Sequence, residues 1–167
     1  MELQRGQTLL TSILAAMAVS ASWLVLAPPS PAQPRDPCPI GNVLVTVERL
    51  QGGFSGQTGD RISIGEDGCF TVDRVINDKM VSRLRSGKLS SDRIASARAA
   101  IEAAHITSLP DRSGTLPPVN PTTLSISYRG TTKTVVAPSG TSIEGMAVLE
   151  GGSLARLAAR LIELTGS

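Results

Sequence analysis

The chain has few of the side chains on which most sites are built. Its 167 residues include one histidine, His105, two cysteines, and only four aromatic residues: Trp23, Phe54, Phe70 and Tyr128. A Ser-His-Asp or Cys-His arrangement would have to use His105, and one histidine with two cysteines does not make a typical zinc site. We therefore expect a non-catalytic protein with no metal site and no cofactor.

The charge and the scarcity of aromatic residues also bear on partners. The formal net charge is +2 at pH 7, with 16 basic and 14 acidic residues. Such a balanced surface does not attract phosphates, and the few aromatic residues form no platform on which bases could stack. We expect no nucleic-acid partner.

The N-terminus has the pattern of an export signal. Arg5 gives a weakly positive start, an uncharged and largely apolar run covers residues 8–27, and prolines and small residues follow. This predicts a signal peptide over residues 1–32 with cleavage after Ala32. The run is also about as long as a short membrane span, so an uncleaved N-terminal anchor is the alternative. We expect a periplasmic or secreted bacterial protein, with a proline-rich, flexible lead at 33–41 and a single domain at 42–167.

Two cysteines in an exported chain suggest one disulfide. A strand after Cys38 would run out to a glycine loop, and the next strand would return to the end where the first began. A tight turn, Glu66-Asp67-Gly68, then delivers Cys69 to that same end. We expect Cys38 and Cys69 to be bonded.

Hydrophobic periodicity predicts a mixed fold. Alternation indicates strands at 42–50, 60–64, 69–76, 122–129 and 131–137, whereas apolar stripes at helical spacing indicate helices at 92–106 and from Ser153 onward. The segment 77–89 fits either a further strand or an irregular crossing, and its basic residues are typical of a solvated face. The result is an α+β domain: an antiparallel sheet of about four to five strands packed with two helices, in the order strands, helix, two strands, helix.

The candidate site is the stretch Gly52, Gly53, Phe54, Ser55 and Gly56, which we expect to continue as a loop through 57–59. It lacks the lysine and the following helix of a phosphate loop. Two interpretations are open. In one, the glycines make a turn or bulge and Phe54 folds back onto the core. In the other, Phe54 protrudes and anchors a partner's apolar pocket.

A strand containing Val45 and Val47 followed by Gly-Gly-Phe-Ser-Gly resembles the emfourin family, small bacterial proteins whose founding member inhibits the thermolysin-like metalloprotease protealysin. The family has a Gly-Gly-Phe-Ala-Gly-like loop there, so Ser55 replaces an alanine. The later order of elements is also similar: a helix ending near 106–110, a strand at 124–128, a strand at 134–136 and a leucine-rich C-terminal helix. The chain departs from the family at Asn120 and Leu124, where the family often has an aspartate and an aromatic residue. The segment 69–89 is longer, and the export signal and cysteine pair are additions.

The resemblance implies that a thermolysin-like metalloprotease is the partner and that inhibition is by occlusion. The glycine loop would enter the active-site cleft, and Phe54 would be its apolar anchor. The Cys38–Cys69 link and the first hairpin would stiffen the base of the loop. The alternative is a non-catalytic binding or structural module of the cell envelope that shares only the fold. A third hypothesis, a small hydrolase, requires a pocket assembled around His105.

Overall fold

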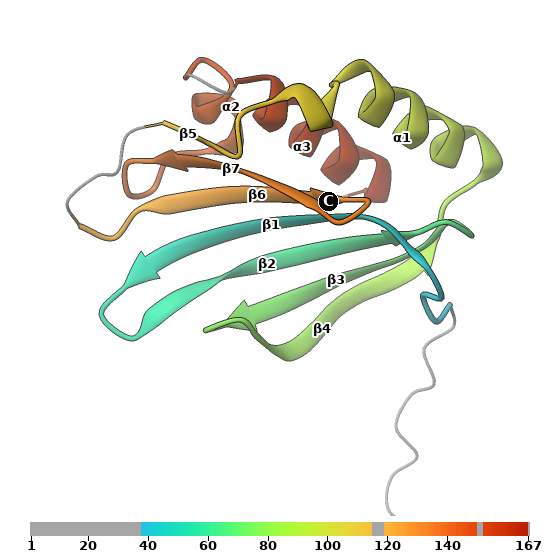
Figure 1. Cartoon of the computed structure of the whole chain (residues 1–167). Coiled ribbons are helices and arrows are strands. Elements are labelled where there is room, and N and C mark those ends of the chain that lie inside the picture. Colours follow the sequence, from blue (N-terminus) through green and yellow to red (C-terminus); the bar gives the residue numbers. More distant parts are fainter. Residues whose placement is uncertain (1–37, 115–118, 150–151, 167) are drawn as a thin grey trace, which may run out of the picture. The chain divides into compact units, whose positions relative to one another are not determined.

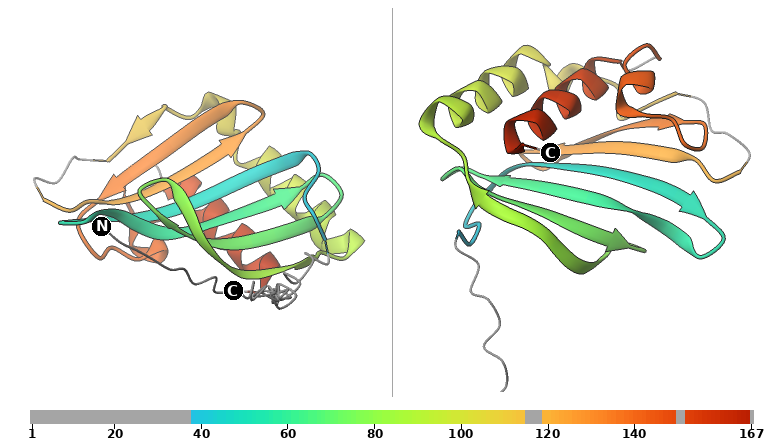
Figure 2. Two further views of the ribbon diagram at one scale, coloured as in Figure 1. Left: turned by 90° about the horizontal axis from the view of Figure 1, so that it is seen from below. Right: turned by 180° about the vertical axis from the view of Figure 1, so that it is seen from behind.

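The computed structural model describes residues 38–114, 119–149 and 152–166. Its architecture is α+β, with one seven-stranded sheet in the order β4-β3-β2-β1-β6-β7-β5. All neighbouring strands are antiparallel except β5, which runs parallel to β7. The helices lie on one face of the sheet (Figure 1), and the view from below shows the other face without a helix over it (Figure 2). The predicted signal peptide or anchor at 1–32 lies outside the described residues.

Eleven elements make up the described chain, and their bounds are β1 Val43–Gly53, β2 Gly56–Gly65, β3 Cys69–Ile76, β4 Lys79–Lys88, α1 Ser91–Ala103, the 3-10 helix η1 Ile106–Ser108, β5 Arg112–Ser113, β6 Thr122–Tyr128, β7 Thr131–Ala137, α2 Ile143–Met146 and α3 Gly152–Thr165. The predicted class and the antiparallel sheet are confirmed. The predicted count of about four to five strands and two helices is too low, because the ambiguous segment is β4, the two-residue β5 has no periodicity to detect, and α2 is a single turn.

The sequence of 77–89 does not show a clear strand pattern because β4 pairs irregularly with β3. The pairing passes from Arg85–Val72 to Arg83–Asp73 and so skips Leu84; further along it skips Val81. Each skip is a bulge, and a bulge breaks the two-residue alternation that identifies a strand. The apolar residues of β4 therefore do not alternate, although the segment is a strand throughout.

The core lies between the sheet and the helices. The stripe predicted for the last helix is buried, at Leu154, Leu157, Leu161 and Leu164. Buried residues of β1, β2, β6 and β7 pack against this stripe, and together they form one continuous apolar cluster. Ser90 caps α1 by accepting a hydrogen bond from the main-chain N–H of Arg93. No helix in the described part of the chain is long and apolar enough to cross a membrane.

The face without helices carries a row of alternating charges. Glu48 on β1 stands opposite Arg61 on β2, Arg61 opposite Asp73 on β3, and Asp73 opposite Arg83 on β4. Glu48 and Arg61 form an ion pair, and Arg83 Nε lies 2.8 Å from Asp73 Oδ1. Burial raises the pKa of Asp73, and the hydroxyl of Thr71 and the charge of Arg61 partly offset this. Opposite charges in register across strands favour this one alignment of β1 to β4.

The disulfide lies at the end of the sheet where β1 and β3 begin. Cys38 and Cys69 are bonded, their Cα atoms are 5.4 Å apart, and both residues are buried. The predicted pairing is confirmed, and the predicted lead is tied to the sheet at Cys38. The predicted role of the bond at the base of the glycine loop is wrong. β2 runs ten residues from that loop to the disulfide end, which is roughly 30 Å.

Candidate functional site

The glycine stretch forms the tip of the β1–β2 hairpin. β1 continues to Gly53 and β2 starts at Gly56, and these two residues are paired, so only Phe54 and Ser55 lie between the strands. The predicted continuation of the loop through 57–59 is wrong, because those residues belong to β2. Gly59 sits in the ladder opposite Leu50, where a Cβ would lie 1.9 Å from the carbonyl oxygen of Arg49. Gly59 is therefore needed because the two strands approach closely at this point, and it does not form part of a loop.

Phe54 is fully exposed at this tip. The residue has a relative exposure of 108%, more than any other large apolar residue described. The interpretation in which Phe54 folds back onto the core is therefore wrong. A two-residue connection gives the chain no length with which to bring the ring back over the sheet. The benzyl group projects into solvent, where it gains nothing for folding and is accessible to a partner.

The neighbouring hairpin holds the tip in shape. Asn77, in the turn between β3 and β4, accepts a hydrogen bond from the main-chain N–H of Gln57 at 2.9 Å and donates from Nδ2 to the carbonyl of Ser55 at 3.2 Å. Its own main-chain N–H donates to the carbonyl of Gln57 at 2.8 Å. Gly56 has φ +103°, and a Cβ there would lie 1.8 Å from Asn77 Oδ1. Glycine at 56 is thus required both by the backbone conformation and by the space that Asn77 occupies.

Gln51 ties three segments together beside the tip. Its Nε2 donates to the carbonyl of Asn120 at 2.7 Å and to Ser139 Oγ at 3.0 Å, and its Oε1 accepts from Thr122 Oγ1 and from the main-chain N–H of Gly140. The three segments are the end of β1, the entry to β6 and the exit of β7. Because one half-buried side chain makes all these bonds, the base of the tip is fixed to the rest of the sheet.

Replacing Gln51 by alanine is expected to lower the free energy of unfolding by about 1 to 2 kcal/mol, because the buried hydroxyl of Thr122 and the half-buried carbonyl of Asn120 would lose their bonds to it. Urea denaturation of both proteins measures this. Thr58→Ala is the matched control, since Thr58 is exposed and stands opposite Gln51 in the β1–β2 pair, and it should change the stability by less than about 0.5 kcal/mol. Equal losses in the two variants would contradict the role given to Gln51.

Asn77 and Gln51 were not among the predicted site residues. Asn77 and Asp78 both have positive φ, at 49° and 62°, and this is a conformation that asparagine and aspartate tolerate better than most residues. The adjacent pair Asn-Asp therefore was a usable turn signal in the ambiguous segment. No local sequence pattern indicates the hydrogen bonds of Gln51, because they join residues 69 to 89 positions apart in the sequence.

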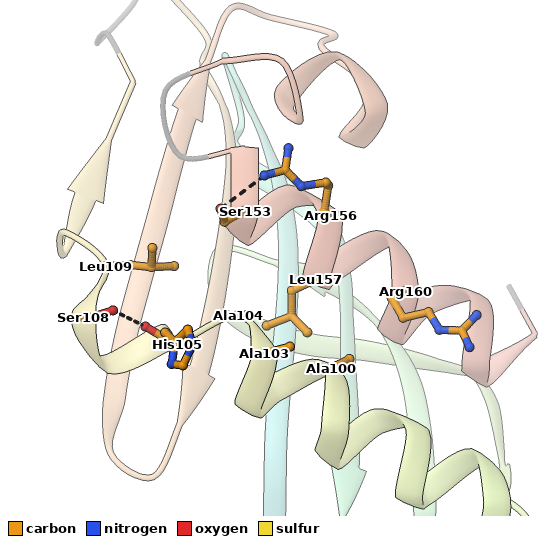
Figure 3. A pocket seen from close by; sticks show the side chains of 10 residues that line it. All are labelled: Ala100, Ala103, Ala104, His105, Ser108, Leu109, Ser153, Arg156, Leu157 and Arg160. Atoms are coloured by element: carbon orange, nitrogen blue, oxygen red, sulfur yellow. Dashed lines mark hydrogen bonds between the residues drawn. The ribbon is translucent and has the colours of Figure 1, made fainter.

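His105 lies beside a surface hollow of about 520 Å³ between α1, η1 and α3. Figure 3 shows its lining, in which small side chains of α1 and Leu157 form the floor and Arg156 and Arg160 project from α3. Ser108 Oγ donates to the main-chain carbonyl of His105 at 2.8 Å. That hydroxyl is thus committed to the backbone rather than to the imidazole, and the residues lining the hollow include no carboxylate to orient the ring. His105 and two serines therefore line the hollow without the carboxylate of a nucleophilic triad.

Among the described residues, no group of three or more histidine, cysteine, aspartate or glutamate side chains is placed to hold a metal ion. Both cysteines are used in the disulfide.

Comparison with protein-family models finds no match to this chain, and comparison with curated proteins finds none either.

Proposed function

We propose that the protein is an exported, non-catalytic inhibitor of a thermolysin-like metalloprotease, and that it acts by placing the tip of the β1–β2 hairpin in the active-site cleft. The observation that carries the proposal is the fully exposed Phe54 on a tip that Asn77 and Gly56 hold in one conformation. A large aromatic side chain in that position is a typical interface anchor.

Occlusion requires shape rather than chemistry. A protein that fills a cleft needs no catalytic group, but it loses affinity if its binding loop must first be ordered. Here the tip is part of a continuous hairpin and is bonded to its neighbour, so little entropy is lost on binding. Thermolysin-like clefts prefer apolar residues, and Phe54 is of that kind.

Two further features support the proposal. The glycine stretch and the order of the later strands and helices are similar to the emfourin pattern. The Cys38–Cys69 bond suits an oxidising compartment outside the cytoplasm, which is where the N-terminal pattern would send the chain.

The test is inhibition of a thermolysin-like protease by the purified, exported protein, with Phe54→Ala and Ser55→Ala beside it. We expect stoichiometric inhibition by the wild type and a rise in the inhibition constant of about tenfold to a hundredfold for Phe54→Ala, the range for a well-buried anchor. Ser55→Ala should change little, since only the main-chain carbonyl of Ser55 is used in the tip.

Each outcome separates the hypotheses. Inhibition that Phe54→Ala leaves unchanged would keep the inhibitor and discard the tip as its site. No inhibition of several such proteases by a folded wild-type protein would contradict the proposal and leave the envelope module as the better hypothesis.

A further inference from the structure

We propose that β4 and Ile76, together called the basic edge, form a second contact surface for the same target, and that the rim of the target's cleft there carries acidic and apolar side chains. The inference rests on the proposed function and adds the chemistry of the partner surface. Its starting point is the small size of the tip.

The tip alone does not make a stable interface. A specific complex buries about 800 Å² on each partner, whereas one aromatic side chain buries about 150 to 250 Å². Ser55 and the glycines add little side-chain area. Most of the contact must therefore come from surfaces next to the tip.

The surface with the most exposed apolar groups is the adjacent hairpin. Of the nine large apolar residues exposed in the described chain, four are on the basic edge: Ile76, Met80, Val81 and Leu84, with relative exposures of 39 to 54%. Val81 and Leu84 are the two bulge residues of β4. Neighbouring exposed apolar side chains are a mark of interaction surfaces.

This surface is joined directly to the tip. Ile76 stands opposite Thr58 on β2, and the next residue, Asn77, makes the three hydrogen bonds that hold the tip. The two hairpin ends are side by side at the same end of the sheet (Figure 1). A partner that received Phe54 would meet the near part of the basic edge, around Ile76 and Met80, without any change in this protein, whereas Lys88 lies at the disulfide end.

The charge of β4 selects the partner. The strand contains Lys79, Arg83, Arg85 and Lys88 and no acidic residue. A second copy of this chain is a poor partner, because two such strands side by side would bring basic residues together, which is unfavourable. The bulges also interrupt the regular outer edge that strand pairing needs. Side-chain contact with an acidic rim is the arrangement that fits both features.

The experiment measures association and dissociation rate constants for the target protease with the full exported protein. Lys79→Glu, at the tip end of β4, is expected to slow association about threefold at low ionic strength, with a smaller effect at high salt, since charges at a rim act mainly on the encounter rate. Arg83 and Arg85 are left in place because Arg83 is paired with Asp73, and Arg85 donates to the carbonyl of Gly166 and stacks on Phe70.

A second variant tests the apolar part. Met80→Ser/Val81→Ser is expected to speed dissociation about tenfold, since lost apolar contact acts on the lifetime of a complex. The matched control for charge is Arg129→Glu, which makes the same change in net charge on an exposed residue at the other end of the sheet from the tip. Circular dichroism confirms that each variant is folded.

The outcomes are distinct. Slower association in the lysine variant alone, with faster dissociation in the apolar variant, supports the inference. Rates in both variants that equal those of the wild type or the control overturn it, while a loss of affinity in Phe54→Ala would still support the inhibitor. No inhibition by the wild type overturns both proposals.

Discussion

Replacement of both cysteines by serine is expected to lower the free energy of unfolding by about 3 to 4 kcal/mol. The bond joins residues 31 positions apart, and the chain-entropy estimate for a loop of that length is of this size. The bond also holds Cys38 against the sheet just before β1. Since domains of this kind are stable by only about 5 to 15 kcal/mol, the loss is a large part of the total.

Denaturation in guanidinium chloride measures this effect. Reduction of the wild type should give the same loss, and a reductant should leave the serine variant unchanged. Inhibition well below the unfolding midpoint should be retained, because the bond lies at the other end of the sheet from Phe54. A loss of unfolding free energy below about 1 kcal/mol, or weaker inhibition by the folded serine variant, would contradict this account.

Substitution of Gly56 by alanine is expected to destabilise the tip by about 2 to 4 kcal/mol. Part of this is the cost of positive φ in a residue with a Cβ, about 1 to 2 kcal/mol. The rest comes from displacement of Asn77, whose Oδ1 would lie 1.8 Å from the new atom, and from the hydrogen bonds lost with it. Native-state hydrogen exchange should be about a hundredfold faster at the amides of Gln57 and Asn77.

Gly53→Ala is the matched control on the other strand of the tip. Gly53 does not have positive φ, and a Cβ there would lie 3.5 Å from the carbonyl oxygen of Gly56, an ordinary contact. It should leave exchange and inhibition near wild type, whereas Gly56→Ala should weaken inhibition as the tip loses its shape. Equal effects at the two glycines would show that Asn77 does not hold the tip.

Regular alternation was enough to predict most of the sheet. Val45 and Val47 on β1, like Leu124 and Ile126 on β6, follow the two-residue period because one face of these strands packs against helices and the other does not. β4 failed the same test because Val81 and Leu84 are bulged and no helix covers the strand. The leucines of α3 gave the clearest helical signal, since every one of them faces the core.

The turn at Phe54 was predictable from the sequence, whereas the contacts that hold it were not. A phenylalanine between glycines marks a turn, but its exposure depends on how many residues the turn contains. The three glycines of the predicted stretch, Gly52, Gly53 and Gly56, all lie in strands. Asn77 lies 20 residues from Gln57 and reaches it only because β3 pairs with β2. Contacts of this kind follow from sheet order and register, which local patterns do not encode.

The full exposure of Phe54 separates recognition from folding at that position. The tip is shaped by Gly56, by Asn77 and by the main chain of Ser55, so none of its bonds involves the ring of Phe54. A different side chain at 54 would therefore fold equally well and present a different surface. In the inhibitor that we propose, a substitution at 54 would therefore change the surface offered to a target without a compensating mutation elsewhere.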